Sequence, residues 1–296
     1  MGYLILQDYL AGKIQQNELN AITQNVIQNR LTCELRAQAQ VIAKLSQRYD
    51  FSKEFTSTDV WSFTLPYKAG QRVYLDAPAY SPTSAYNLNS LTTNNGLVYI
   101  NTTPIALPGE AFVSGHWGLL GNQYSIFGVN YPNSVFDSRT YYNIGFKVWW
   151  RDIVYTAITT SMTTDQEQAI QAGTYSNLTL GTVLPDDPIN GSKMWGTGVA
   201  YSVIAGTLPT NATFFTAGDN RAQDLVKLYL DISIYEMCGG VSPQNVPEIR
   251  KNNWLYAIKC LEAYAKGDNN LALPLIQPLQ GSTIRNGGKI ARQNYY

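Results

Sequence analysis

The spacing of apolar residues changes twice along the chain, and these changes divide it into three stretches. Near the N-terminus, apolar residues at helical spacing predict a short helix over residues 4–14 and a long one over 20–48. Near the C-terminus, the same spacing predicts helices over 220–238 and 247–266. Between them, residues 59–218 are rich in Gly, Pro, Thr, Tyr and Trp, which favour turns and strands.

Glycine and proline mark the expected helix ends. Gly239 and Gly240 predict the end of the third helix, since glycine adopts a left-handed C-cap at little cost. Pro247 suits the first turn of the last helix, which should end at Gly267. We expect the helices from both ends of the chain to pack together around a core that contains Ile22, Leu35, Ile42, Leu225, Ile232, Trp254 and Leu261.

The expected fold is therefore of the α+β class: a helical bundle formed by the N- and C-terminal segments, with an inserted β-rich region. Residues 1–58 supply the N-terminal helices and residues 59–218 the insertion. Residues 219–268 form a C-terminal helical hairpin, and residues 269–296 an extended arm. Both ends of the chain are then needed for one core.

The β-rich region contains an internal duplication. Tyr67-x-x-Gly70-x-Arg72-Val73-Tyr74 matches Tyr142-x-x-Gly145-x-Lys147-Val148-Trp149, and Tyr80 matches Tyr155, all 75 positions apart. Trp117-Gly118 matches Trp195-Gly196, and Tyr124-Ser-Ile matches Tyr201-Ser-Val, at offsets of 78 and 77. These matches predict two small β units, over residues 61–128 and 136–208.

The aromatic residues of these units have two interpretations. They can fill the cores of small domains, which need large side chains. Alternatively, Trp149, Trp150 and Tyr155 form an exposed row for sugar stacking, because the motif also resembles small chitin-binding-type modules. On that alternative, the chain is a carbohydrate-binding accessory protein of a virion.

Composition excludes several classes of protein. The chain has 21 basic and 21 acidic residues, so it lacks the excess of positive charge typical of proteins that grip nucleic acid broadly. The abundance of aromatic residues, 12% of the chain, argues against an intrinsically disordered protein. No stretch approaches the roughly 20 apolar residues of a membrane span. The N-terminal run Met1-Gly-Tyr-Leu-Ile-Leu has no basic region and is too short for the apolar region expected of a signal peptide. We therefore expect no membrane partner.

Catalytic motifs are missing from the sequence. His116 is the only histidine, which removes every multi-histidine metal site. There is no phosphate-binding GxxxxGK[ST] loop, no HExxH and no GxSxG. Asp186 and Asp187 lie between two prolines and predict a solvated turn. The three cysteines show no CxxC pairing and are expected to be reduced thiols. We expect no catalytic residues, metal or cofactor.

The two helical ends of the chain resemble a known family. The segment Asp219-Asn-Arg-Ala-Gln…Tyr235-Glu-Met-Cys…Ser242-Pro243-Gln-Asn245-Val-Pro247-Glu248-Ile-Arg250…Ala265-Lys266-Gly267-Asp268 resembles the C-terminal hairpin of the head–tail connector (neck ring, or adaptor) family of tailed bacteriophages. The N-terminal run Asp8-Tyr9…Ile22-Thr23…Ala39…Arg48-Tyr49-Asp50 is similar to the opening helices of that family. The β-rich middle departs from it, since typical members have a much shorter segment there.

The resemblance implies a structural ring protein of the virion neck, assembled in the host cytoplasm, with twelve copies in a closed ring. Its partners would be further copies of itself, the portal protein, and other neck or tail proteins. Genomic DNA would pass through the lumen without sequence-specific binding during packaging and ejection. The arm has no acidic residue after Asp268 and should order on a neighbouring subunit or the portal. Its candidate contact residues are Arg285, Lys289, Arg292, Tyr295 and Tyr296.

Overall fold

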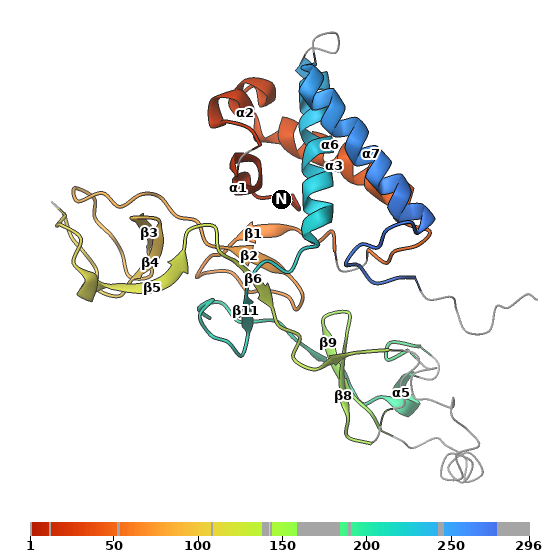
Figure 1. The fold of residues 1–296 in the computed structure, drawn as a ribbon. Coiled ribbons are helices and arrows are strands. Elements are labelled where there is room, and N and C mark those ends of the chain that lie inside the picture. Colours follow the sequence, from red (N-terminus) through yellow and green to blue (C-terminus); the bar gives the residue numbers. More distant parts are fainter. Residues whose placement is uncertain are drawn as a thin grey trace, which may run out of the picture. The chain divides into compact units, whose positions relative to one another are not determined.

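The protein has an α+β fold, in which helices and three small sheets occupy separate parts of the chain (Figure 1). The computed structural model describes residues 2–11, 13–51, 54–107, 109–137, 142, 144–158, 184–188, 191–241 and 246–276. The chain divides into two compact units. Unit 1 contains Met1–Gln15 and Thr56–Asn220, and unit 2 contains Gln16–Phe55 and Arg221–Tyr296.

The first fifteen residues belong to the β-rich unit and not, as expected from the sequence, to the other N-terminal helices. The helix α1 (Leu6–Leu10) is also shorter than predicted. The backbone N–H of Thr58 donates to the Gly2 carbonyl at 3.1 Å, and the Arg72 guanidinium lies over the Tyr3 ring at 5.8 Å. These contacts tie the N-terminus to the first strands of unit 1.

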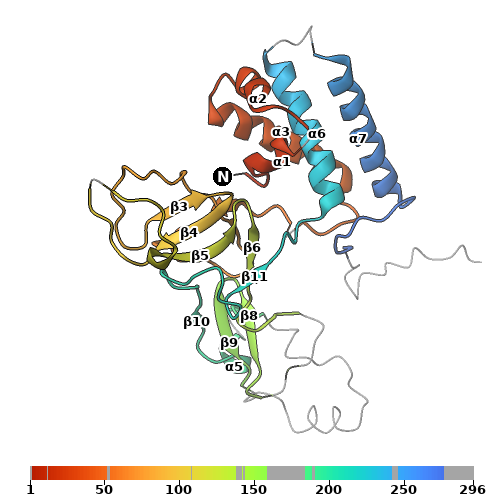
Figure 2. The ribbon, with the colours of Figure 1, turned by 60° about the vertical axis from the view of Figure 1, so that its left-hand side comes forward.

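Unit 1 is built on three sheets (Figure 2). The first has the order β1-β2-β6-β11, with β1 Thr58–Val60, β2 Arg72–Tyr74, β6 Ile126–Val129 and β11 Phe215–Ala217. The second has the order β3-β4-β5, with β3 Leu91–Asn94, β4 Leu97–Asn101 and β5 Trp117–Asn122. The third has the order β10-β9-β8-β7, with β7 Ser134–Val135, β8 Lys147–Trp150, β9 Ile153–Thr156 and β10 Val199–Ala200. Two short helical turns accompany them, η1 (Ser114–His116) and α5 (Gly191–Met194).

Two hydrophobic clusters hold the sheets of unit 1. The larger draws on the first and second sheets and contains Trp61, Tyr67, Val73, Leu75, Val98, Ile100, Leu120, Phe127, Val129, Val203 and Phe215. The smaller belongs to the third sheet and contains Phe136, Tyr142, Val148, Tyr155, Ala157 and Trp195. Eight aromatic side chains of this region thus fill its cores.

The two segments with the repeated sequence motif share one local geometry. The hydroxyls of Tyr67 and Tyr142 each bond with the backbone N–H and carbonyl of the residue five positions earlier. Gly70 and Gly145 follow in left-handed conformations, with φ of 76° and 84°. The strands β2 and β8 begin two residues after these glycines.

Two further matches predicted from sequence offsets, those of Tyr80 with Tyr155 and of Tyr124 with Tyr201, are not equivalent in the structure. Tyr155 lies within β9, whereas Tyr80 precedes β3 and donates its N–H to the Thr93 carbonyl. Tyr124 occupies a left-handed turn with φ of 66°, and Tyr201 does not. Tyrosine is so frequent here that a constant offset can align residues of different structural roles.

The described residues of unit 2 form four helices: α2 (Gln16–Thr23), α3 (Ile27–Leu45), α6 (Gln223–Val241) and α7 (Glu248–Lys266). The single long helix predicted over 20–48 is therefore two helices. Gln24 and Asn25 break it, with φ of 55° and 57°. The Thr23 hydroxyl donates to the Leu19 carbonyl at 2.7 Å and closes the last turn of α2.

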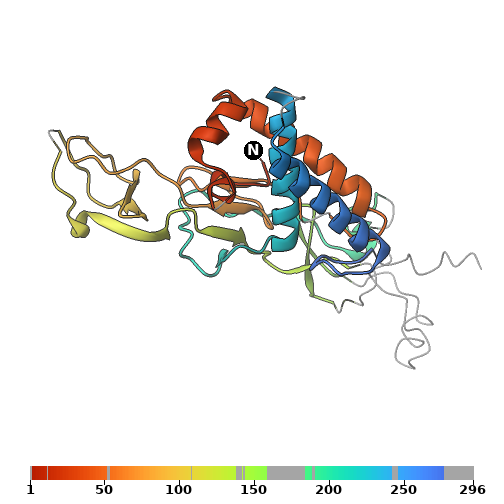
Figure 3. The same ribbon diagram turned by 45° about the horizontal axis from the view of Figure 1, so that its top comes forward.

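The predicted end of α6 at Gly239-Gly240 is wrong, because the helix continues to Val241. Glycine permits a left-handed turn but does not impose one. The end of α7 matches its prediction: Gly267 has φ of 92° and donates its N–H to the Ala263 carbonyl at 3.0 Å. α6 packs against both α3 and α7 (Figure 3; α3 orange, α6 cyan, α7 blue).

Candidate assembly surface

The helix α6 lies at the centre of unit 2. Eleven of its nineteen residues are buried, and Leu225 and Ile232 are fully excluded from solvent. Helices from the other end of the sequence cover it. Gln40 of α3 donates to Glu236 of α6 at 2.7 Å, and Tyr229 donates to α3 as described below. Residues almost 200 positions apart thus share one core.

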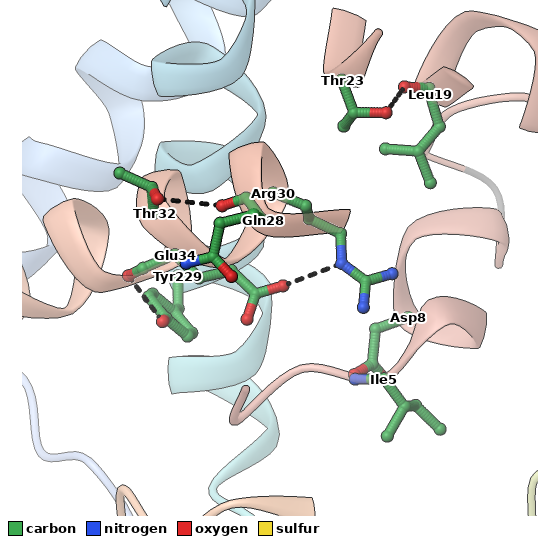
Figure 4. Close-up of polar contacts among 9 residues, drawn as sticks. All are labelled: Ile5, Asp8, Leu19, Thr23, Gln28, Arg30, Thr32, Glu34 and Tyr229. Carbon is green, nitrogen blue, oxygen red and sulfur yellow. Dashed lines mark hydrogen bonds and ion pairs between the residues drawn. The ribbon is translucent and has the colours of Figure 1, made fainter. Parts of the chain in front are cut away.

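A buried polar contact joins α3 to α6 (Figure 4). The Tyr229 hydroxyl donates to the Glu34 backbone carbonyl at 2.6 Å. The Glu34 side chain is 2% exposed, and its Oε1 lies 3.4 Å from Nε of Arg30. Burial, with the nearby Glu34 carboxylate, raises the pKa of Tyr229 far above its usual range. The phenol is therefore a permanent neutral donor.

The helix α7 is buried along one narrow stripe only. Ala257 and Leu261 are fully buried, and Trp254 is half-buried with its ring stacked on Tyr235 at 4.7 Å between centroids. Large apolar side chains project from the rest of the helix: Ile249 is 65% exposed and Tyr256 is 57% exposed. A helix that buries one stripe and displays a second apolar surface is suited to contact a partner. We define the α7 face as Ile249, Leu255 and Tyr256.

The helix α3 and its N-cap also expose large apolar side chains to solvent. Leu35 was expected in the core, but this prediction is wrong, since its side chain is 63% exposed. The buried stripe of α3 runs instead through Ala37, Val41 and Leu45, and Leu35 lies on the other side of the helix. Ile27, in the first turn of α3, is 66% exposed. We define the α3 face as Val26, Ile27 and Leu35.

The other residues predicted for the core fall in two groups. Leu225, Ile232 and Leu261 are fully buried, as described above. Ile22 and Ile42 are half-buried, on α2 and α3. Helical periodicity therefore located the core of α6 and α7 more accurately than that of α3.

The predicted contact residues of the C-terminal arm, Arg285, Lys289, Arg292, Tyr295 and Tyr296, lie outside the described residues. The described start of the arm is anchored within unit 2. The Asp50 N–H donates to the Pro274 carbonyl and the Ile276 N–H to the Arg48 carbonyl, both at 2.8 Å. This backbone pairing fixes the place from which residues 277–296 continue, beside the end of α3. The Ser-Pro-x-Asn turn at residues 242–245 also lies outside the described residues.

The residues proposed for an aromatic surface do not form an exposed row. Tyr155 is only 9% exposed, and the two tryptophans are half-buried. Trp149 and Trp150 are adjacent in β8, so their side chains point to opposite sides of the sheet. Trp149 packs edge-on against Tyr131 at 4.9 Å, and Trp150 packs against Phe136 at 5.3 Å.

Asp186, expected as a solvated turn residue, contributes to this part of unit 1. Its carboxylate accepts from Trp150 Nε1 at 2.9 Å and from Arg151 at 2.8 Å. The Arg151 guanidinium lies over the Trp150 ring at 5.1 Å and covers it. A covered ring is a poor platform for a sugar.

No group of three or more His, Cys, Asp or Glu side chains that could hold a metal ion occurs among the described residues. His116 Nδ1 is hydrogen-bonded to Glu110 in unit 1. Burial raises the pKa of the Cys33 and Cys238 thiols, which makes them poor nucleophiles. None of the described helices is long and apolar enough to cross a membrane.

Comparisons with protein-family models, with curated proteins and with solved structures find no match to this chain.

Proposed function

We propose that the protein is a structural head–tail connector of a tailed-phage virion, with no catalytic activity. In this proposal, copies of the chain form a closed ring, of about twelve subunits by the family resemblance, that docks on the portal. The ring extends the DNA channel and forms the platform for the tail or the next neck protein. DNA passes through its lumen without sequence-specific binding.

One observation carries the proposal: unit 2 exposes large apolar side chains on two different helices. A closed ring requires each subunit to present two non-identical surfaces, one to each neighbour. The α3 face and the α7 face meet this requirement, with Leu35 at 63% exposure and Ile249 at 65%. Unit 2 also contains most of the two segments that carry the family resemblance, from Ile22 to Asp50 and from Arg221 to Asp268.

The finer description of the fold is part of the proposal. We infer that the N- and C-terminal helices form one split bundle, with the β-rich region inserted between them. Direct ties between α3 and α7, such as the 2.7 Å ion pair between Lys44 and Glu262, support this inference. The shared geometry around Tyr67 and Tyr142 supports an origin of the insertion by duplication.

The charge balance is compatible with a DNA conduit. Packaged DNA must slide through the channel, and a strongly basic lumen would retain it. The chain has equal numbers of basic and acidic residues. The alternative of a carbohydrate-binding accessory protein has less support, because the candidate tryptophans are half-buried and one is covered by Arg151.

The proposal is tested on the purified full-length chain, alone and mixed with the portal protein. We expect closed rings by negative-stain electron microscopy and an oligomer by light scattering, or ring formation on the portal. A chain that stays monomeric at high concentration and does not bind the portal would contradict the proposal.

Matched variants test whether the two faces form the subunit contact. Ile249→Gln and Leu35→Gln should reduce ring formation at least tenfold without lowering the thermal midpoint, because both side chains are already exposed. Ile204→Gln is the control: Ile204 is 72% exposed but lies in unit 1. Equal effects of all three substitutions on ring formation would show that the α3 and α7 faces do not form the subunit contact.

A further inference from the structure

The three sheets of unit 1 repeat one pairing between a first strand and a second. The paired positions lie fourteen residues apart in each sheet, and the strands run parallel: Thr58 with Arg72, Ala79 with Thr93, and Ser134 with Val148. An aromatic residue follows the first strand and donates its N–H to a carbonyl thirteen residues later: Trp61 to Tyr74, Tyr80 to Thr93, and Phe136 to Trp149. The three loops between these first and second strands therefore have the same length and are closed by the same backbone hydrogen bond.

Each of these loops is held by a tyrosine. The hydroxyl bonds with the N–H and the carbonyl of the residue five positions earlier: Tyr67 with Ser62, Tyr86 with Ser81, and Tyr142 with Asp137. Three positions after the tyrosine, the backbone is left-handed, at Gly70, Asn89 and Gly145 with φ of 76°, 65° and 84°. The N–H of that residue then donates to the third strand, at Val129, Asn101 and Ala157.

The third and fourth strands also correspond. The residues opposite the end of the third strand are aromatic in all three sheets: Phe215 opposite Val129, Trp117 opposite Asn101, and Trp195 opposite Ala157. Each packs edge-on against the tyrosine of its own loop, at centroid distances of 6.1, 5.1 and 5.5 Å. Independent hydrogen bonds, backbone angles and ring contacts thus recur together three times.

We propose that unit 1 contains three copies of one β module, two of them inserted in the first, and that the third copy, which has a core of its own, is not needed for ring assembly. Module 1 consists of residues 58–75, 125–130 and 203–217. Module 2, residues 77–122, is inserted in the turn between β2 and β6. Module 3, whose described parts are residues 134–137, 142, 144–158, 184–188 and 191–200, is inserted between β6 and β11. The long motif that starts at Tyr67 recurs only in module 3, at Tyr142, so module 2 rests mainly on the structure.

The insertion points are closed in the way expected for nested domains. At the base of module 2, the Leu75 N–H donates to Ser125 at 3.0 Å, and Gln123 donates to Asp76 at 2.8 Å. At the base of module 3, the Asn130 N–H donates to Phe214 at 2.8 Å. Thr102 and His116 make the equivalent bond in module 2, also at 2.8 Å.

The cores of the modules show which insertion is removable. Val98, Ile100 and Leu120 of module 2 belong to the same cluster as Trp61 and Val73 of module 1. Module 3 has a cluster of its own around Trp195. Because a hydrophobic core is the unit of cooperative folding, removal of module 3 should leave the buried core of module 1 in place, with the loss only of the partly buried Tyr201 that packs on it, whereas removal of module 2 opens that core.

Module 2 supplies the design of the deletion. In module 2, Thr102 and Ile105 occupy the positions that Asn130 and Val203 occupy in module 1. Thr103-Pro104 connects Thr102 to Ile105, so the same two residues can connect Asn130 to Val203. In the full chain, residues 131–202 are therefore replaced by Thr-Pro. The matched control removes module 2: residues 76–124 are replaced by Asn-Gly, the turn that joins β3 to β4.

The module 3 deletion should unfold cooperatively, with a thermal midpoint within about 5 °C of the full chain, whereas the control should lose at least 10 °C or fail to fold. Loss of folding on deletion of module 3, or an equal loss for the two deletions, overturns the proposal. Calorimetry of Tyr142→Phe and Tyr67→Phe in the full chain gives a second test. Tyr142→Phe should shift a separate transition, and a common shift by both variants counts against an independent module 3.

The inference that assembly does not need module 3 rests on the proposed ring function and is tested by ring formation. The module 3 deletion should form rings with the same copy number as the full chain. If the full chain forms rings and the folded deletion variant does not, module 3 is needed for assembly and this part of the proposal is wrong. If neither forms rings but the variant folds, the connector proposal fails and the three-module architecture stands.

Discussion

The Tyr229 hydroxyl donates a 2.6 Å hydrogen bond to the backbone carbonyl of Glu34 and so joins two helices from opposite ends of the chain. Tyr229 is 1% exposed. Solvent therefore has little access to the hydroxyl that donates this bond. The contact ties the fold of unit 2 to the presence of both chain ends.

Removing this hydroxyl should destabilise unit 2. Tyr229→Phe keeps the ring but takes away the donor, and we expect a loss of about 1–3 kcal/mol in the free energy of unfolding. Urea denaturation followed by tryptophan fluorescence measures it. Tyr235→Phe is the control, since that ring is half-buried and stacked on Trp254, and its change should stay within about 0.5 kcal/mol. Equal losses for the two variants would contradict the role of the Tyr229 hydroxyl.

Stability should fall in alkaline solution. Burial raises the pKa of Cys33 and Cys238 above their ordinary value of 9.0, and that of Tyr229 above 10.0. The unfolded chain releases these protons first and binds fewer of them than the folded chain, so the free energy of unfolding decreases as pH rises. The contribution is complete below pH 9 and is lost progressively above it.

The alkaline loss can be assigned with variants. Cys33→Ala with Cys238→Ala should flatten the decline that starts near pH 9, and Tyr229→Phe should flatten the part above pH 10. The measurement is the urea midpoint as a function of pH. A decline of unchanged steepness in all these variants would show that other groups cause it.

Helical periodicity predicted most of the described helices but not where one of them breaks. The Gly267 end of α7 followed from the known preference of glycine for a left-handed C-cap. The break between α2 and α3 is made by Gln24 and Asn25, which are not strong helix breakers, so the sequence carried no clear signal. Leu35 was assigned to the core because a long continuous helix was assumed through this region.

The sequence pattern did not identify module 2 as a separate copy, for a different reason. Its equivalence to modules 1 and 3 lies in backbone pairing, in the hydrogen bonds of Tyr86 and in the left-handed Asn89. Asn replaces Gly at that position, since both adopt φ above zero. The motif Ser62-x-Thr64-x-x-Tyr67 recurs as Ser81-x-Thr83-x-x-Tyr86 and could have identified the copy at an offset of 19.

Cys260 should report on ring assembly. It is half-buried and lies one turn after Tyr256 of the α7 face, whereas Cys33 and Cys238 are buried. A thiol reagent should therefore modify Cys260 first in the isolated subunit, and the other two only after unfolding. If the α7 face is a subunit contact, modification of Cys260 should slow at least tenfold in the ring. Unchanged reactivity would exclude this end of the α7 face from the contact.

Substitutions at two leucines of α7 test folding and ring assembly separately. Leu261 is fully buried and Leu255 is 39% exposed, so the same truncation has different consequences at the two positions. Leu261→Ala should cost about 2–5 kcal/mol of unfolding free energy, because it leaves a cavity in the core of unit 2. Leu255→Ala should cost less than about 1 kcal/mol in the isolated subunit but weaken ring formation, since Leu255 belongs to the α7 face. The comparison requires urea unfolding at low protein concentration and light scattering at high concentration.

If Leu255→Ala leaves the rings unchanged, the contact lies elsewhere on α7. If it unfolds the subunit as strongly as Leu261→Ala, Leu255 is part of the core and the α7 face must be redrawn around Ile249 and Tyr256.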